Sequence, residues 1–168
     1  FIILNMHIKL INKKIHFNNY KVKCAVGKRG ISSKKVEGDN KTPRGTFKIQ
    51  AIYYRKDRMK ELKSLIKKKN IRKNMGWCDD SKSKKYNKLI KFPFSWGAEK
   101  LYLNSRIYDI LLILNFNNKP VKKKKGSAIF VHIAKKNYSP TKGCIAVSKI
   151  DMRKIVSRIR RNSKITIY

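Results

Sequence analysis

His132 and Cys144 are the two side chains of this chain whose types and spacing best fit joint chemistry. An apolar run over residues 128–133 predicts a buried strand with His132 near its end, and a loop containing Pro and Gly then leads back to Cys144. A thiol has a reference pKa of about 8.5 and is mostly protonated at neutral pH, so it needs a nearby base or positive charge to act as a nucleophile. His132 can supply the base, and Lys142 is a candidate for the charge.

Several short motifs stand in a fixed order before this pair and around it. They are Gly38-Asp39, Thr42-Pro43-Arg44-Gly45-Thr46-Phe47, Gly76-Trp77-Cys78-Asp79-Asp80, Tyr86-Asn87, Tyr108-Asp109, Gly126-Ser127 and Thr141-Lys142-Gly143-Cys144. A lone His/Cys pair is weak evidence, because three cysteines and three histidines offer several such pairs, whereas an ordered set of motifs is more specific. The set resembles the catalytic domain of the L,D-transpeptidase (YkuD-type) family over residues 24–159.

The resemblance implies that Cys144 is the nucleophile and that His132 is its base. Ile133 follows the base, and we expect its backbone carbonyl to hold the imidazole in one tautomer. The backbone N–H groups expected to form an oxyanion hole are those of Thr141, Lys142 and Gly143. Many family members carry a second histidine just before the Gly-Cys pair, where this chain has Lys142. This departure bears on substrate orientation and on tuning of the thiol.

The reaction implied by the resemblance is acyl transfer on peptidoglycan. In the family, the thiolate attacks the carbonyl after the third residue of a tetrapeptide stem, releases the terminal D-alanine and passes the acyl group to an amine. Two other functions stay open: hydrolysis of the same stems by water, and a non-catalytic polyanion-binding protein on this scaffold. No metal or organic cofactor is implied, and the cysteines at 24, 78 and 144 match no close-paired zinc motif.

A basic, glycine-bearing loop over residues 27–45 contains the first candidates for substrate binding. Arg44 lies at its end, and a guanidinium can bind a carboxylate through two hydrogen bonds. Lys35 and Arg29 are further candidates in the same loop. We therefore expect this loop to enter the following strand, residues 46–54, beside the catalytic centre.

Residues 75–96 are rich in aromatic residues, Asp, Ser and Pro, which predicts a long irregular loop. Such a loop either covers the core or forms a wall of a substrate cleft, because long loops are uncommon without a function. Trp77 and Tyr86 are the substrate-binding candidates in it. Asp79 and Asp80 are adjacent on an extended segment and point apart, so capping or hydrogen bonding is expected of them rather than joint catalysis.

The charge of the chain is extreme, with 44 Lys and Arg against 9 Asp and Glu and a formal net charge of +35. Such a charge attracts anionic polymers without specificity. The lysines are spread along the whole chain together with many Asn and Ile, which is typical of a biased composition and not of one dedicated site.

The length of 168 residues and the hydrophobic content of 41% predict one core and a single domain over residues 1–168, expected to be a monomer. No apolar run approaches the roughly 18 residues that span a bilayer, and no signal peptide is visible, although the chain does not begin with Met. The family leads us to expect the bacterial cell envelope, on the periplasmic or cell-wall side.

Alternating or apolar runs predict strands over residues 2–11, 14–17, 20–26, 46–54, 106–115, 128–133 and 164–168. Helical spacing predicts a short surface helix in residues 55–74, and a capping box from Ser148 to Asp151 predicts the start of another. Cys24 alternates with Tyr20 and Val22 and is expected to face the core. The fold class is mainly β (α+β), and the resemblance implies a β-sandwich-like catalytic domain with one or two short helices.

Overall fold

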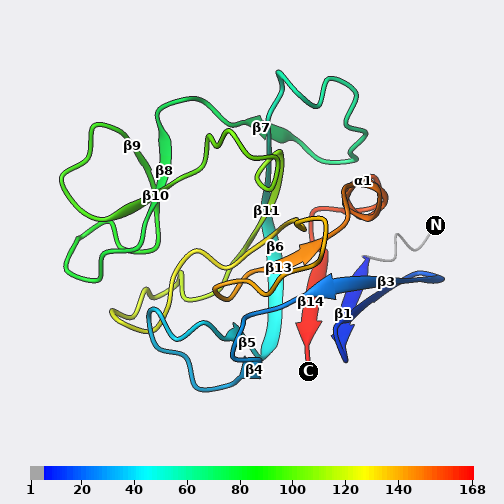
Figure 1. The fold of residues 1–168 in the computed structure, drawn as a ribbon, viewed down its shortest axis with the longest axis horizontal. Coiled ribbons are helices and arrows are strands. Elements are labelled where there is room, and N and C mark those ends of the chain that lie inside the picture. The colour runs from blue at the N-terminus through cyan, green and yellow to red at the C-terminus, as the bar shows by residue number, and fades with distance from the viewer. Residues whose placement is uncertain (1–5) are drawn as a thin grey trace.

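The structure is a computed structural model that describes residues 6–168, so the first residues of the strand predicted over 2–11 lie outside the described part (Figure 1). The described elements are β1 (His7–Ile11), β2 (Lys14–Phe17), β3 (Tyr20–Ala25), β4 (Ile31–Ser32), β5 (Thr42–Pro43), β6 (Gly45–Tyr54), β7 (Lys68–Asn70), β8 (Met75–Cys78), β9 (Leu89–Lys91), β10 (Ala98–Lys100), β11 (Ile110–Leu114), β12 (Phe130–Ile133), β13 (Ile145–Val147), α1 (Lys149–Val156) and β14 (Lys164–Ile167).

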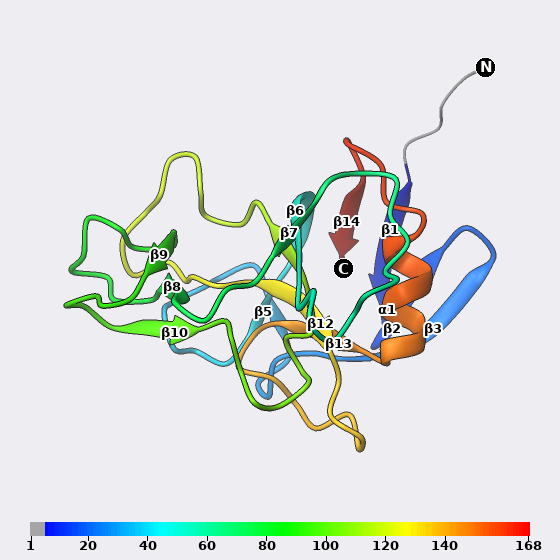
Figure 2. The same cartoon turned by 90° about the horizontal axis from the view of Figure 1, so that it is seen from above.

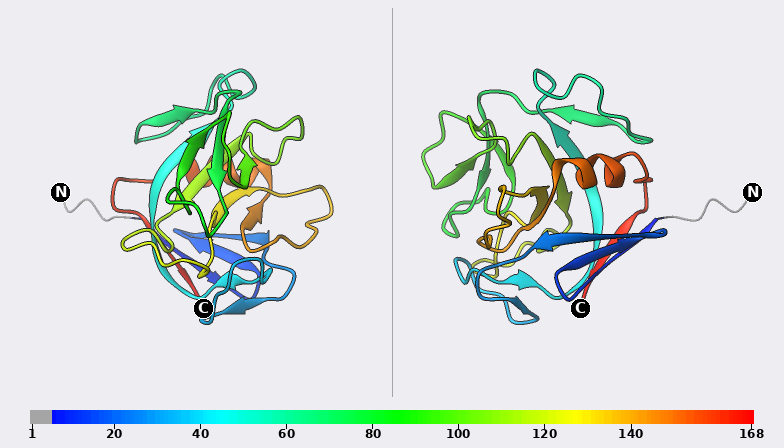
Figure 3. Two further views of the ribbon diagram at one scale, coloured as in Figure 1. Left: turned by 90° about the vertical axis from the view of Figure 1, so that its left-hand side faces the viewer. Right: turned by 45° about the vertical axis from the view of Figure 1, so that its right-hand side comes forward.

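The main sheet closes on itself into a barrel. Its strands follow the order β11-β12-β13-β3-β2-β1-β14-β6, and β6 pairs again with β11. The pairs β1–β14 and β12–β13 are parallel, so the sheet is mixed. Figure 3 shows β14, from the end of the chain, lying beside β1 from its beginning. The prediction of a mainly β fold with one or two short helices is confirmed.

The sequence pattern of each strand matches its place in the barrel. Along β1, Ile8 and Leu10 are buried while the residues between them are exposed, as expected for a strand with one face toward water. All five residues of β11 are buried, because this strand lies between β6 and β12 and is covered on both faces. The apolar run that predicted a central strand is therefore explained by two-sided burial.

Cys24 on β3 faces the core, as predicted, with an exposed fraction of 2%. Burial raises the pKa of its thiol to about 12. We expect Cys24→Ser to lower the free energy of unfolding by about 1–3 kcal/mol, because the hydroxyl would be buried without a designed partner. Urea unfolding followed by circular dichroism measures this loss. A variant with unchanged stability and lost activity would reverse the structural assignment.

The helix α1 begins where the capping box predicted it. Ser148 Oγ accepts a hydrogen bond from the Asp151 N–H at 3.1 Å and donates one to Asp151 Oδ2 at 2.7 Å. Met152, Ile155 and Val156 are buried and join the barrel core, so the helix packs along the barrel (Figure 2). Within residues 6–168, no helix is long and apolar enough to cross a membrane.

The helix predicted in residues 55–74 is wrong. The segment forms turns and then β7, which pairs in parallel with the second half of β6. Its apolar spacing had a different cause: Met59 and Leu62 are both buried in the barrel core, while Leu65 is exposed. Lysines four residues apart, such as Lys63 and Lys67, repel each other in a helix, and the free edge of β6 offers backbone hydrogen bonds instead.

Residues 75–96 were predicted to be irregular, but β8 and β9 lie within them. With β10 they form a three-stranded antiparallel sheet, the small sheet, which projects from the barrel on the left of Figure 1. Gly76 on β8 is required there, because a Cβ would lie 2.6 Å from the ring of Phe92. The small sheet and the residue after β8 supply acidic side chains to the cavity described next.

Candidate active site

A cavity of about 660 Å³ contains both His132 and Cys144. Its walls come from four parts of the chain: the loop over residues 35–40, the small sheet with the turn before β11, strand β12 with the residues before it, and the loop over residues 135–146. The two residues singled out from the sequence are therefore brought together in one pocket of the protein.

Two neighbouring strands hold the pair in place. Strands β12 and β13 are parallel partners, with His132 opposite Ala146, and Cys144 lies immediately before β13. On the other side of β13, Ala146 pairs with Ala25 of β3, so β13 is paired on both edges. The buried, hydrogen-bonded sheet fixes the backbone at both reactive residues.

The imidazole of His132 is held by a backbone carbonyl that defines its tautomer. Its Nδ1 lies 3.0 Å from the carbonyl oxygen of Ile133, and because a carbonyl only accepts, a neutral ring must carry its proton on Nδ1. This leaves the lone pair on Nε2, and the contact is the one expected of Ile133 from the sequence. Burial lowers the pKa of His132 below its usual range, which keeps the ring neutral at neutral pH.

The thiol of Cys144 is held by backbone groups of the strand that carries the base. Its Sγ donates to the carbonyl of Ala128 at 3.1 Å and accepts from the N–H of Phe130 at 3.4 Å. Burial, followed by the carboxylate of Glu99, raises the pKa of Cys144 to about 12, against smaller lowering effects from the Phe130 N–H and the ammonium of Lys35. The resting group is therefore a neutral thiol at neutral pH.

The protonation of Cys144 predicts how the free protein reacts with iodoacetamide. Without the His132 base, alkylation must go through the free thiolate, whose fraction grows tenfold per pH unit below the pKa. In His132→Ala, alkylation of Cys144 should therefore keep rising from pH 7 into the alkaline range, toward the pKa of about 12. Peptide mapping separates this cysteine from Cys24 and Cys78, which are buried. A rate in His132→Ala that has already reached its plateau near neutral pH would show a preformed thiolate and contradict this description.

A buried threonine supports the loop that carries the cysteine. Thr42 Oγ1 donates to the carbonyl of Gly143 at 2.9 Å and accepts from the N–H of Gly27 at 2.8 Å. Gly143 itself has φ of +141°, and a Cβ there would lie 2.8 Å from the carbonyl oxygen of Lys41. The loop before Cys144 is thus packed against the loop that ends in Thr42, which explains why both motifs stand in the sequence.

We expect Thr42→Val to destabilise the protein by about 1–3 kcal/mol, because it removes the acceptor of the buried Gly27 N–H and the donor to Gly143. Denaturant unfolding measures the loss. Thr166→Val is a matched control, since the Thr166 hydroxyl makes its hydrogen bonds at the exposed surface. Equal stability losses in the two variants would show that the buried contact has no special importance.

Two of the three N–H groups expected to form the oxyanion hole already have acceptors. The Thr141 N–H donates to the carbonyl of Val26 at 3.0 Å, and the Gly143 N–H donates to Thr141 Oγ1 at 3.1 Å. Thr141 Oγ1 in turn donates to the carbonyl of Cys144 at 2.6 Å, which closes a tight turn. The remaining candidates for oxyanion donors in this loop are therefore the N–H of Lys142 and that of Cys144 itself.

Of the substrate-binding candidates from the sequence, Lys35 lines the cavity, whereas Arg44, Trp77 and Tyr86 do not. Arg44 is exposed, and its backbone N–H pairs with Ser32. Trp77 packs edge-on against Phe130. Tyr86 is completely buried, and its hydroxyl donates to Glu37. The geometry gives these three residues supporting positions around the cavity, so it offers no contact through which they would bind substrate.

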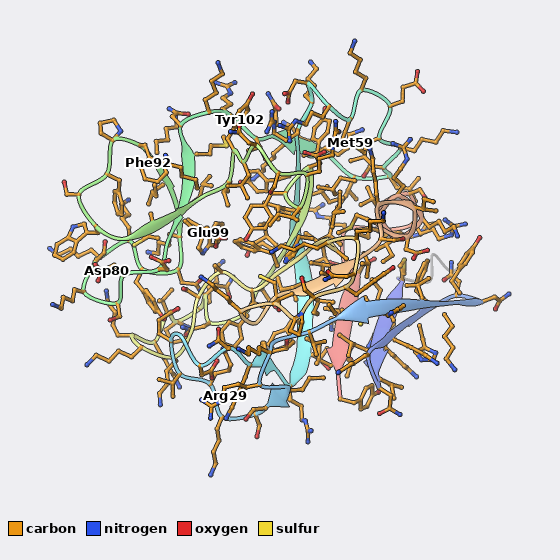
Figure 4. The ribbon with its side chains drawn as sticks, in the orientation of Figure 1. Arg29, Met59, Asp80, Phe92, Glu99 and Tyr102 are labelled. Atoms are coloured by element: carbon orange, nitrogen blue, oxygen red, sulfur yellow. The ribbon has the colours of Figure 1, made fainter. Side chains whose placement is uncertain are left out.

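The cavity contains polar residues to which the sequence analysis gave no role in a site. Glu99 of β10, Tyr108 just before β11 and Asp79 all line it. Figure 4 shows Glu99 between the small sheet and the barrel, while Asp80 and Phe92 lie toward the outer side of that sheet. The available signal was the rarity of acidic residues, 9 in the whole chain.

The lysines near the site differ in what they affect. Lys35 is nearly buried, donates to Asp39 and to the carbonyl of Lys41, and is the cation that lowers the pKa of Cys144. Lys142 is exposed at the cavity and lowers the pKa of Glu99 instead. Within residues 6–168, no three His, Cys, Asp or Glu side chains come together in a way that could hold a metal ion.

Comparison with known proteins identifies a family for this chain. The family model YkuD, described as the L,D-transpeptidase catalytic domain, matches residues 8–167. No curated protein matches the chain. The matched range includes every residue of the cavity described above.

Proposed function

Since the chain belongs to the YkuD family of L,D-transpeptidase catalytic domains, we propose that it is a cysteine acyltransferase that cross-links peptidoglycan stem peptides. The observation that carries the proposal is the single cavity in which His132, with its Nδ1 engaged by Ile133, and the thiol of Cys144 both lie. A neutral base and a neutral thiol in one cavity form the pair that acyl transfer requires.

In the first half of the proposed reaction, Cys144 Sγ attacks the carbonyl carbon after the third residue of a tetrapeptide stem. His132 Nε2 takes the thiol proton as the sulfur–carbon bond forms. The tetrahedral intermediate then collapses, the carbon–nitrogen bond breaks, and His132 returns the proton to the departing amine of D-alanine. The product is a thioester between the tripeptide stem and Cys144.

In the second half, the amine of another stem attacks the thioester. His132 takes a proton from that amine, the new amide forms, and the proton passes to the leaving sulfur of Cys144. Water in place of the amine would release a tripeptide, which is the L,D-carboxypeptidase alternative. Both reactions share the acyl-enzyme and differ only in the acceptor.

We assign stabilisation of the oxyanion to backbone N–H groups of the loop at Thr141 to Cys144, in particular those of Lys142 and Cys144, because the other two already have acceptors. Loss of one oxyanion donor typically costs about 2.7–4 kcal/mol of transition-state stabilisation. Gly143 has a positive φ, a backbone conformation that only glycine adopts easily, and it keeps the loop in this shape.

The setting proposed for this activity is the bacterial cell envelope, with residues 1–168 acting as one monomeric catalytic domain. The formal charge of +35 would draw such a protein to anionic polymers without defining its substrate. A purely polyanion-binding protein is the second candidate, and it has no use for a thiol beside a base.

Product analysis tests the proposal and separates its alternatives. The purified protein is incubated with tetrapeptide stems, and the products are resolved by liquid chromatography and mass spectrometry. We expect cross-linked dimers together with free D-alanine. Tripeptides without dimers would identify a hydrolase, and unchanged stems would leave only the binding function.

A further inference from the structure

The ring of His132 has a neighbour that the mechanism above does not use. Tyr108 packs against it with ring centroids 5.4 Å apart and ring planes at 71°. A backbone hydrogen bond of 2.9 Å from the Ile133 N–H to the carbonyl of Ile107 ties the two segments together beside this contact. The bond from Nδ1 to Ile133 fixes one edge of the imidazole, and the tyrosine ring limits its rotation from another direction.

Tyr108 is itself held at its other end. Its hydroxyl donates to Glu99 Oε1. Its ring also packs in a T-shaped arrangement with the ring of Phe130, with the ring centroids 6.2 Å apart. The tyrosine is 6% exposed, so it has little freedom once this hydrogen bond is made. A buried tyrosine with both its ring and its hydroxyl engaged is a rigid support.

Burial of the Glu99 carboxylate beside Tyr108 is energetically unfavourable. The carboxylate is partly buried, and burial, together with the negative charge of Asp79, raises its pKa, while the Tyr108 hydroxyl and the ammonium of Lys142 lower it. A buried charge is disfavoured unless it is hydrogen-bonded. Glu99 comes from β10. Its hydrogen bond to Tyr108, followed by the ring contact of Tyr108 with His132, connects the small sheet to the base on β12.

We propose that Tyr108, anchored by Glu99, is a positioning residue that holds the His132 ring in the orientation that accepts the proton of Cys144. The inference rests on the proposed function for its biological meaning. Its physical content concerns only the free protein. The small sheet, through Glu99, is then a part of the catalytic machinery and not merely a cover of the cavity.

Alkylation of Cys144 by iodoacetamide near neutral pH tests the inference without any stem peptide, because the thiol proton must then pass to His132. Tyr108→Phe keeps the ring and loses the bond to Glu99, and we expect alkylation to slow about tenfold, part of the gain that a positioned base supplies. The opposite result, faster alkylation, is what electrostatics alone predicts: Glu99 would lose a hydrogen bond that lowers its pKa, and a protonated Glu99 no longer raises that of Cys144.

A pair of substitutions at Glu99 isolates its role as an acceptor. Glu99→Gln and Glu99→Ala both remove the charge, but only Gln keeps an oxygen for the Tyr108 hydroxyl. We expect Glu99→Gln to react at least as fast as wild type and Glu99→Ala about tenfold more slowly than Glu99→Gln. Equal rates in these two variants would overturn the proposal. The pair also replaces Tyr108→Phe as the deciding test if that variant does not fold.

A double-mutant cycle distinguishes positioning from general loosening of the fold. In a His132→Ala background, Tyr108→Phe should not slow alkylation, because the base that it positions is gone. Only the electrostatic effect of Glu99 on the Cys144 thiol remains there, and it acts toward faster reaction. Tyr102→Phe is a matched control, since its hydroxyl faces Asp57 and its ring covers Arg55, away from the cavity. Slowing in the His132→Ala background, or an equal effect of Tyr102→Phe, would show a purely structural role.

The outcome is separate from that of the proposed function. If the variants are alkylated at the expected rates but the protein never forms an acyl-enzyme from stems, the positioning of His132 is retained and the transpeptidase assignment is lost. A protein that forms the acyl-enzyme with full alkylation in Tyr108→Phe would keep the function and lose this inference. With stems, positioning further predicts a fall in kcat at unchanged KM.

Discussion

Cys144→Ala is expected to abolish acyl transfer and hydrolysis, with turnover reduced by a factor on the order of 10³ or more. The methyl group cannot form a thioester, and no other cysteine lines the cavity among residues 6–168. The fold should persist, because the substitution removes a single sulfur atom from a half-buried position beside β13. Turnover of tetrapeptide stems and circular dichroism measure the two effects.

The control for this substitution is Cys24→Ala, which removes a thiol from the barrel core. It should lose stability and keep turnover per folded molecule, because Cys24 lies on β3 and outside the cavity lining. Substantial turnover in Cys144→Ala, or equal loss in both variants, would exclude Cys144 as the nucleophile.

His132→Ala is expected to reduce kcat by about 10² to 10⁴, the range that a positioned general base supplies. The neutral thiol of Cys144 depends on this base, since burial raises its pKa to about 12. The matched control is His7→Ala, because His7 is exposed on β1 and its Nε2 contacts the Thr166 hydroxyl at the surface. Steady-state kinetics at neutral pH separates the two variants.

The pH profile of the wild type provides a second check on His132. Burial lowers the pKa of the imidazole, so the base stays neutral to a more acidic pH than a free histidine would. The acid limb of kcat/KM should therefore fall below the ordinary histidine pKa of about 6.5, and it should be absent in His132→Ala. An acid limb that persists in the variant would assign the titration to another group.

The parts of the fold that follow from local pattern could be predicted from the sequence. Strands β1 to β3 alternate because one face meets water, and the turn at Asn18 joins two of them. The cap of α1 is also local, since Ser148 bonds to a residue three positions later. Such elements need no knowledge of the rest of the chain.

The errors arose where distant contacts decide the backbone. Met59 and Leu62 have helical spacing, yet each reaches the core from a turn held by other parts of the chain. Arg55 illustrates the cause: its guanidinium bonds to Asp57 and to the carbonyl of Leu103, far away in sequence. Periodicity alone cannot distinguish such a turn from a helix.

The residues of the candidate site likewise fall into those that a local motif reveals and those that only a distant contact reveals. His132 and Cys144 stand in recognisable motifs, and the carbonyl of Ile133 is adjacent to the base, so all three could be selected from the sequence. Glu99 could not, because its partner Tyr108 is reached through a side-chain hydrogen bond between the small sheet and the barrel. A single carboxylate in the three-residue strand Ala98–Lys100 forms no sequence motif that would indicate a role in a site.

The most direct test of the central claim is intact-protein mass spectrometry after brief incubation with tetrapeptide stems. We predict a covalent adduct with the mass of the stem minus D-alanine, located by peptide mapping on Cys144 and lost in Cys144→Ala. Stems that are processed without any adduct on Cys144, or an adduct that maps to Cys24 or Cys78, would contradict the assignment of this cavity as a cysteine acyltransferase site.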